Sequence, residues 1–263
     1  MLKIRSIASG SKGNCIYIAS ETTQILVDIG LSLREVTNRL KSVDIDPSTI
    51  DAVLVTHEHG DHIHGVSKFL NKYNCPIYLH EEAAEIHANA IGEFPLELLH
   101  TFNDTFKIGD ITVDFCEVPH DSEFCFAYSF IQNDCKISLA TDLGSATPEL
   151  INLMGGSQIV LLECNHDMLK LQNNIKYPMV LKRRISGNKG HLSNAAASLA
   201  IFELAKTGVQ QIILAHLSEQ NNSPTLAYGF VRDFLYRKGL IEGTDISIDV
   251  AEQHRPGRLY QID

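Results

Sequence analysis

The sequence lacks several features that would assign it to a membrane or to an oxidising compartment. None of its apolar stretches approaches the roughly 20 residues needed to cross a bilayer. Lys3–Ala8 opens the chain as an alternating, strand-like stretch rather than as the apolar core of a signal peptide. No Cys-x-x-Cys pair occurs among the six scattered cysteines, which is typical of reduced, buried thiols. These absences predict a cytoplasmic protein that has no membrane partner.

Basic residues are also few, with 22 Lys and Arg against 32 Asp and Glu and a formal charge of −10. This balance argues against a sequence-independent nucleic-acid coat protein, which would be strongly basic. It does not exclude a nucleic-acid enzyme, because bound divalent metals and a local basic patch change the field at a site. No Pro/Gly/Ser-rich linker, low-complexity tract or repeat divides the 263 residues, so we expect a single domain over 1–263.

Short strands and helices alternate along the chain. Alternating or β-branched runs predict strands at Lys3–Ala8, Cys15–Ala19, Gln24–Asp28, Ala52–Val55, Ile77–Leu79, Ile111–Val118, Phe124–Ile131, Lys136–Ala140, Ile159–Leu162, Gln211–Ala215 and Ile246–Val250. Helical spacing of apolar residues predicts helices at Leu31–Leu40, directly after His62, and at Glu81–Ile91, Leu192–Ala205 and Thr225–Tyr236. Blocks of adjacent strands mixed with strand–helix units favour a layered α/β fold, with two sheets that each carry helices on the outer face.

A cluster of metal-type donors follows the strand expected at Ala52–Val55. It consists of His57, His59, Asp61 and His62. Imidazole and carboxylate together suit zinc, manganese or iron. In a turn after a strand, the first two side chains can point to one side and the last two to another, so that one loop can serve two adjacent ions. The alternative is a solvated polar loop, but Gly60 and Gly65 let the chain turn tightly and favour the metal site.

The pattern His-x-His-x-Asp-His resembles the signature of the metallo-β-lactamase superfamily. Four further residues, each at the end of an expected strand, match its later motifs: Asp28, His120, Asp142 and His216. The resemblance covers residues 1 to about 220 and implies a four-layer αββα sandwich with two divalent metals, zinc, manganese or iron. It implies that His57, His59 and His120 hold one ion, that Asp61, His62 and His216 hold the other, and that Asp142 bridges them. Asp61 would also orient the hydroxide nucleophile, and Asp28 would hydrogen-bond the ligand loop.

Further segments narrow the resemblance to one branch. Asp142 stands where a β-lactamase would favour cysteine, and Gly190–Asn194 is similar to the Gly-His-x-Ser motifs of nuclease branches. The segments Ala8–Asn14, Leu162–Asp167, Leu214–Ser218 and Asn221–Asn222 extend the match to the YycJ/WalJ group of bacterial metal-dependent nucleases. The resemblance to that group implies a binuclear hydrolase acting on DNA as a 5′→3′ exonuclease, with a link to DNA maintenance.

The segment between Glu163 and Asn194 supplies the expected substrate contacts. His191 is expected to meet the scissile phosphate, beside an anion-binding helix start at Ser193 and Asn194. The most basic stretch of the chain, with Lys182, Arg183 and Lys189, is expected to follow the phosphate backbone. Glu163 is expected to contact the metal ligands and orient them without binding a metal itself. The alternatives are a capping cluster with His191 on the surface and a solvated helix face.

Two other functions remain open from the sequence. One is a small-molecule hydrolase of thioesters or lactones that uses the same two metals. The other is a regulatory protein that binds metal without turnover, although the complete ligand set argues against it. His166 is left open between a structural role and a substrate contact.

Overall fold

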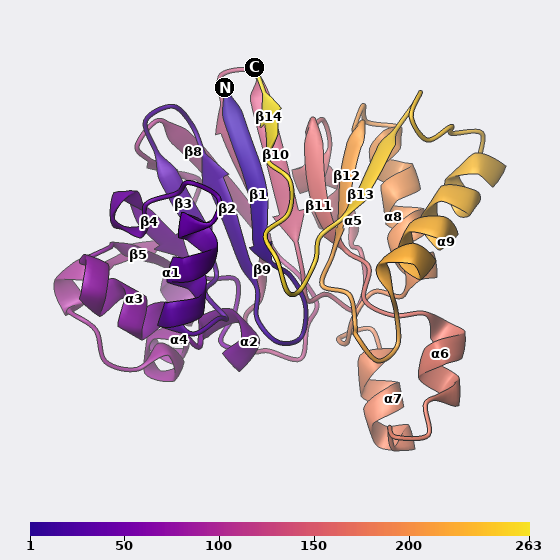
Figure 1. Ribbon diagram of the computed structural model, residues 1–263, viewed down its shortest axis with the longest axis horizontal. Helices are drawn as coiled ribbons and strands as arrows, with labels where there is room; N and C mark the ends of the chain where they lie inside the picture. Colours follow the sequence, from indigo (N-terminus) through magenta and orange to yellow (C-terminus); the bar gives the residue numbers. More distant parts are fainter. The chain divides into compact units, whose positions relative to one another are not determined.

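The computed structural model describes residues 1–263 and divides into two compact units. The first unit comprises Met1–Asp114, Phe130–Cys135 and Glu252–Asp263. The second unit comprises Phe115–Ser129 and Lys136–Ala251. Each unit has its own apolar core, and Figure 1 shows the path of the chain from indigo to yellow.

The first sheet has seven strands in the order β14-β1-β2-β3-β4-β5-β6. Its strands are β1 (Leu2–Ala8), β2 (Cys15–Ala19), β3 (Gln24–Val27), β4 (Ala52–Leu54), β5 (Ile77–His80), β6 (Leu99–Phe102) and β14 (Tyr260–Ile262). Pairing is antiparallel from β14 to β3 and parallel from β3 to β6. Both termini therefore lie on neighbouring strands of this sheet (Figure 1).

The first unit carries four helices. They are α1 (Leu33–Lys41), α2 (Gly60–Ile63), α3 (Val66–Tyr73) and α4 (Ala84–Ile91), with short 3-10 turns at Pro47–Thr49, Glu81–Ala83 and Leu96–Leu98. Ser32 caps α1 by accepting a hydrogen bond from the Glu35 amide, and Val36 and Leu40 follow at helical spacing. Both are fully buried in the core that also holds Phe69 of α3.

The second sheet has the order β13-β12-β11-β10-β9-β8-β7. Its strands are β7 (Phe106–Ile108), β8 (Ile111–Glu117), β9 (Phe126–Gln132), β10 (Cys135–Ala140), β11 (Ile159–Glu163), β12 (Gln211–Ala215) and β13 (Ser247–Val250). From β10 to β13 the strands are parallel, so each connection must cross back over the sheet, and helices make these crossings. The carboxyl ends of β10, β11 and β12 therefore share one edge, where polar residues can gather.

The second unit carries five helices. They are α5 (Pro148–Met154), α6 (Met168–Asn173), α7 (Met179–Ile185), α8 (Asn194–Ala205) and α9 (Pro224–Arg237). α5, α8 and α9 each bury several apolar side chains, whereas α6 buries only Leu171 and α7 buries none. Figure 1 shows α6 and α7 projecting away from the sheet of this unit.

Every strand and helix expected from the sequence is present within a few residues of its expected bounds. The helix expected after His62 is split into α2 and α3, and the helix expected from Leu192 begins at Asn194. The strands β6, β7 and β14 and the helices α5, α6 and α7 were not expected. No helix of the structure is long and apolar enough to cross a membrane.

Candidate metal centre

The histidine loop of the first unit, residues 56–62, follows β4 and is held in place by a buried aspartate. Asp28 has a left-handed backbone (φ 62°), which turns its carboxylate back toward the loop. Its Oδ1 accepts the Thr56 amide and its Oδ2 accepts the Thr56 hydroxyl, both at 2.8 Å. The same Oδ2 lies 2.7 Å from Nδ1 of His62. Asp28 therefore fixes both ends of the turn and the orientation of one imidazole.

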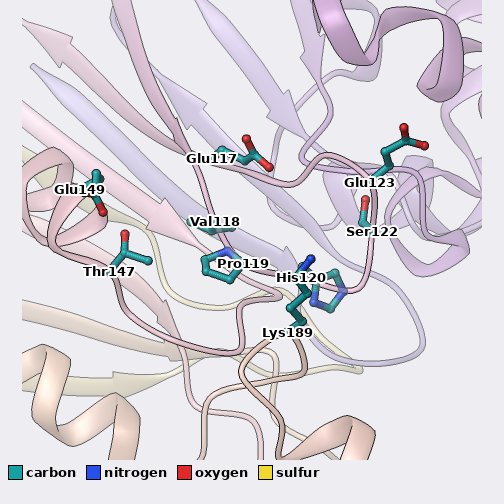
Figure 2. Close-up of a pocket in the computed structure, with 9 residues that line it drawn as sticks. All are labelled: Glu117, Val118, Pro119, His120, Ser122, Glu123, Thr147, Glu149 and Lys189. Carbon is teal, nitrogen blue, oxygen red and sulfur yellow. The ribbon is translucent and has the colours of Figure 1, made fainter.

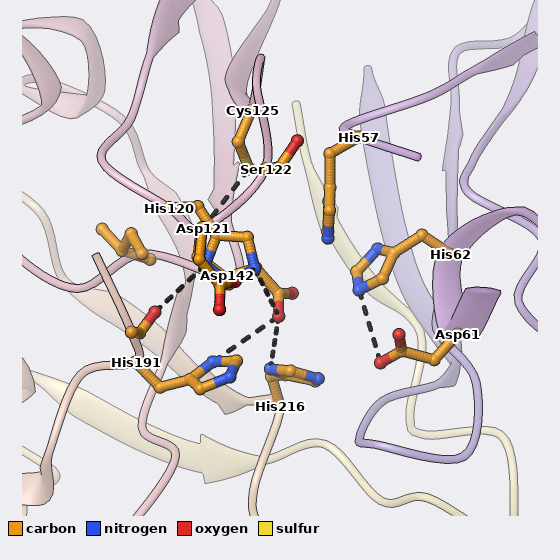
Figure 3. A network of polar contacts seen from close by, with 12 residues as sticks. His57, Asp61, His62, His120, Asp121, Ser122, Cys125, Asp142, His191 and His216 are labelled. Carbon is orange, nitrogen blue, oxygen red and sulfur yellow. Dashed lines mark hydrogen bonds and ion pairs between the residues drawn. The ribbon is translucent and has the colours of Figure 1, made fainter. Parts of the chain in front are cut away.

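The four donors of this loop lie side by side. The His57 ring centroid lies 4.6 Å from that of His59 and 4.2 Å from that of His62. Nε2 of His62 lies 3.7 Å from Oδ2 of Asp61, as Figure 3 shows. The backbone of Asp61 packs so tightly on Gly30 that a Cβ at position 30 would come within 1.7 Å of the Asp61 carbonyl oxygen. The loop can approach this closely because position 30 has no side chain.

In the second unit, the buried carboxylate of Glu163 organises two histidines. Its Oε1 lies 2.9 Å from Nδ1 of His191 and 2.8 Å from Nδ1 of His216. The backbone amides of Asp142, Leu143 and Leu192 also donate to the two carboxylate oxygens. Burial alone would raise the pKa of Glu163, but the charge of His191 and the hydrogen bonds from both histidines hold it well below its usual range. Glu163 is therefore ionised and accepts a hydrogen bond from the Nδ1–H of each ring.

Asp142 and His216 complete a compact group with these residues. Both have left-handed backbones, with φ of 60° and 53°; Asp142 lies two residues after the end of β10 and His216 directly after β12. One donor atom from each of Asp142, Glu163, His191 and His216 lies within 4.8 Å of the others. Nδ1 of His216 lies 3.2 Å from Oδ1 of Asp142. Figure 3 shows His191 and His216 directed toward the Asp142 carboxylate.

His120 enters the same group from the loop after β8. Its Nδ1 lies 3.1 Å from the Gly190 carbonyl oxygen, to which it can donate, and its Nε2 lies 4.0 Å from Oδ1 of Asp142. Its ring centroid is 5.3 Å from that of His191. Burial is the largest cause that lowers the pKa of His120, which favours the neutral ring that a metal requires.

His191 differs from its neighbours because its side chain reaches solvent, with 22% of it exposed. Burial alone would lower its pKa, but the ionised Glu163 and the hydrogen bond to it raise the pKa above the usual histidine value. The Asp142 carboxylate, whose Oδ1 lies 3.5 Å away, also favours the protonated ring. A partly exposed histidine that is protonated can contact an anion or donate a proton.

A cavity of about 400 Å³ opens beside His120 in the second unit (Figure 2). Val118 and Pro119 give it an apolar wall, and Lys189 lies at its edge. Its remaining lining residues are polar or acidic: Glu117, Ser122, Glu123, Thr147 and Glu149. This volume falls within the range of sites for small organic ligands.

The remaining expected substrate contacts lie in different environments. Arg183 and Lys189 are exposed, whereas the Lys182 ammonium donates to the Gln172 carbonyl at 2.6 Å. Ser193 caps α8 by accepting the Ala196 amide. Asn194 is only 1% exposed, and its side chain is hydrogen-bonded to Asn222.

Some residues around the donors were not singled out from the sequence as part of a site. Nδ2 of Asn14 lies 2.9 Å from Nε2 of His62, and Thr56 joins Asp28 to the histidine loop. Oδ1 of Asp121 lies 3.2 Å from Nε2 of His120, and Asp121 also pairs with Arg184. Asn14 and Thr56 stand within or beside conspicuous motifs, which is the only sequence signal for them. The pairing of Asp121 with Arg184 has no local signal, because it joins distant parts of the chain.

The donor chemistry of both units fits divalent metal ions. In four histidines the ring nitrogen Nδ1 faces a protein oxygen: Thr56 Oγ1 for His57, Asp28 for His62, the Gly190 carbonyl for His120 and Glu163 for His216. Metal-binding histidines characteristically bond the protein through one nitrogen, which orients the other toward the ion. With Asp61 and Asp142, the set is one of imidazole and carboxylate, which suits zinc, manganese or iron.

Comparison with known proteins agrees with this chemistry. The Metallo-beta-lactamase superfamily model matches residues 8–124. The metallo-β-lactamase fold protein YhfI from Bacillus subtilis, a solved structure, superimposes with a TM-score of 0.73 over 98% of each chain at 17% identity. The fold class predicted from the sequence, the αββα metallo-β-lactamase fold, is thereby confirmed, with two mixed sheets flanked by helices.

Two curated relatives narrow the assignment. The chain is 33% identical to exodeoxyribonuclease YycJ from Bacillus anthracis over 97% of each sequence. It is also 33% identical to exodeoxyribonuclease WalJ from Streptococcus pneumoniae, over 94% of this chain and 93% of the relative. The chain therefore belongs to the YycJ/WalJ group of the metallo-β-lactamase superfamily. It is a hydrolase of that superfamily with candidate metal-binding residues.

Proposed function

We propose that this protein is a binuclear metal-dependent phosphodiesterase that degrades DNA as a 5′→3′ exonuclease. The proposal includes one domain over residues 1–263 with one binuclear centre. His57, His59 and His120 would hold one ion, Asp61, His62 and His216 the other, and Asp142 would bridge them. The observation that carries the proposal is His191, a partly exposed histidine that Glu163 orients beside Asp142 and His216. Similarity to two exodeoxyribonucleases over nearly the whole chain supports it.

The two ions would supply positive charge at the phosphate and lower the pKa of a water toward neutrality. The chain itself would position and protonate the reactants. Asp61 would accept a hydrogen bond from the attacking water and so orient it. Glu163 would keep the His216 ring in place by accepting its Nδ1–H.

His191 would act on the leaving group. Its Nδ1–H is donated to Glu163, so Nε2 is the atom that faces away from the buried carboxylate. The Glu163 and Asp142 carboxylates raise the pKa of His191 and so favour a proton on Nε2, which His191 would donate to the leaving oxygen or to a phosphate oxygen. This proposed role distinguishes His191 from the histidines that would hold the metals.

The competing function is hydrolysis of a thioester or lactone at the same two metals. Such a substrate has no phosphate for His191 to contact, so the histidine should matter far less. The basic residues Arg183 and Lys189 would also lack an anionic polymer to bind.

The decisive assay uses end-labelled single- and double-stranded DNA and RNA, with manganese, magnesium or zinc added to the metal-free protein. We expect products that shorten from the 5′ end of DNA. His191→Ala should lower the rate by roughly 10²–10⁴-fold while the protein keeps its metals. His100→Ala, on an exposed histidine of β6, is the matched control. Hydrolysis of a thioester by wild type and His191→Ala alike, with no DNA cleaved, would refute the proposal.

A further inference from the structure

Residues 168–189, here called the basic lobe, are unlike the rest of the surface. The lobe includes α6, α7 and the turn that leads to His191, and it contains no acidic residue in a chain of net charge −10. Its six basic residues are Lys170, Lys176, Lys182, Arg183, Arg184 and Lys189. Charge of one sign is therefore concentrated in a part of the molecule that projects from its unit (Figure 1).

The same lobe exposes large apolar side chains. Five of the eleven exposed large hydrophobic residues of the chain lie in it: Met168, Leu169, Ile175, Met179 and Val180. Ile175 in the turn between the helices is 97% exposed, and Val180 is 79% exposed. Single exposed apolar residues are ordinary, whereas such a concentration marks an interaction surface.

Apolar and basic side chains alternate on this surface. Val180 precedes Arg183 and Arg184 by three and four residues, so these side chains are neighbours on one face of α7. Lys176 directly follows Ile175, and neither Lys176 nor Arg183 forms an ion pair in the structure. The ligand of this face should therefore be apolar and anionic at once.

The lobe is anchored to the candidate metal centre. The Ile185 carbonyl at the end of α7 accepts the backbone amide of His191 at 2.8 Å. Arg184 pairs with Asp121, the neighbour of His120. Gly190 packs against the Arg184 and Ile185 carbonyl oxygens, where a Cβ would come within 2.3 Å. A polymer lying on the lobe would therefore be led toward His191.

We infer that the basic lobe binds single-stranded nucleic acid, with its apolar side chains packed against unpaired bases and its basic side chains on the phosphates. This inference rests on the proposed function and extends it to the form of the substrate. Phosphates alone would be matched by basic residues, and a duplex hides the faces of its bases. Exposed base faces next to phosphates occur in single strands, which proteins bind by combining stacking contacts with cationic grooves.

Fluorescence anisotropy with a labelled single-stranded oligodeoxynucleotide and with its duplex tests the inference. All proteins carry His191→Ala, so that the ligand is not consumed, and are loaded with metal. The double substitution Ile175→Ser and Val180→Ser should weaken single-strand binding by about tenfold, because each loses apolar area packed against a base, and leave duplex binding unchanged. Lys176→Gln with Arg183→Gln should weaken both and reduce the salt slope of single-strand binding by roughly 1.4. Leu96→Ser with Ile241→Ser, on exposed apolar residues outside the lobe, should change neither.

Two results would overturn the inference. One is that the Ile175→Ser, Val180→Ser protein binds the single strand as tightly as the His191→Ala protein does, or that its affinity for the duplex falls as much as its affinity for the single strand. The other is a parent protein that binds phosphatidylglycerol vesicles through the lobe while its oligonucleotide affinity is insensitive to the four substitutions. Hydrolysis is scored separately with the wild-type protein. If the wild-type protein cleaves DNA but the lobe substitutions leave the oligonucleotide affinities unchanged, only the binding role of the basic lobe is refuted. If no nucleic acid is cleaved, the proposed function is refuted.

Discussion

Replacing Glu163 by glutamine tests whether its carboxylate orients His191 and His216. The side chain keeps its size, but one acceptor oxygen becomes an NH₂ donor. The carboxylate receives three hydrogen bonds at Oε1, from His191, His216 and the Asp142 amide. It receives two at Oε2, from the Leu143 and Leu192 amides. Whichever way the glutamine amide is placed, its NH₂ group faces at least two buried N–H donors.

The magnitude follows from the number of donors that lose their acceptor. With the NH₂ toward Leu143 and Leu192, two buried amides lose their acceptor at about 1–3 kcal/mol each, or about 2–6 kcal/mol in all. With the NH₂ toward His191 and His216, Nδ1 of each ring can accept a hydrogen bond from the glutamine only if the ring proton moves from Nδ1 to Nε2. The His216 nitrogen that should bind metal is then blocked, and the metal affinity should fall by roughly 10–100-fold.

Urea denaturation of the metal-free protein and metal titration of the folded protein measure the two effects separately. We expect Glu163→Gln to lower the free energy of unfolding, the metal affinity, or both, by the amounts above. Glu203→Gln, on an exposed glutamate of α8, should change neither. Wild-type stability and wild-type metal affinity in Glu163→Gln would show that the carboxylate does not organise the histidines.

Other substitutions separate the remaining parts of the account. Asp61→Asn should keep the fold and at least one metal but lower the rate of DNA cleavage at least about a hundredfold, because it no longer orients the water; near-normal turnover of the metal-loaded variant would contradict this role. Burial lowers the pKa of His166 to about 4, so the folded state resists a proton that the unfolded chain takes up below about pH 6.5. The free energy of unfolding of the metal-free protein should therefore fall between about pH 6.5 and pH 4, by roughly 3 kcal/mol for this group. His166→Gln should flatten that part of the profile and His254→Gln, on an exposed histidine, should not; equal slopes in all three proteins would refute the assignment.

The regular part of the fold follows from local patterns. The β12 strand was expected with its observed bounds because Gln211–Ala215 is a short apolar run, and β-branched residues favour such a strand. The carboxyl-terminal ends of such strands are where Asp142, Glu163 and His216 lie. Alternation and helical spacing thus located most elements, and the order of the histidine motifs located the donors.

Other features could not be read from the sequence, because they depend on distant contacts. α7 has no buried residue, and its contacts are with Gln172, Asp121 and His191 rather than with a core. Asn194 looked like part of an anion site because helix starts bind anions, but its side chain turns inward to Asn222. The hydrogen bonds from two histidines to one Glu163 oxygen likewise require three strand ends to meet.

Anomalous diffraction from crystals of the metal-loaded protein tests the proposed binuclear centre most directly. We expect two peaks roughly 3.5–4 Å apart, with Asp142 between them. His57, His59 and His120 should surround one peak, and Asp61, His62 and His216 the other. A single peak, or peaks bound by the residues of one unit alone, would contradict the account.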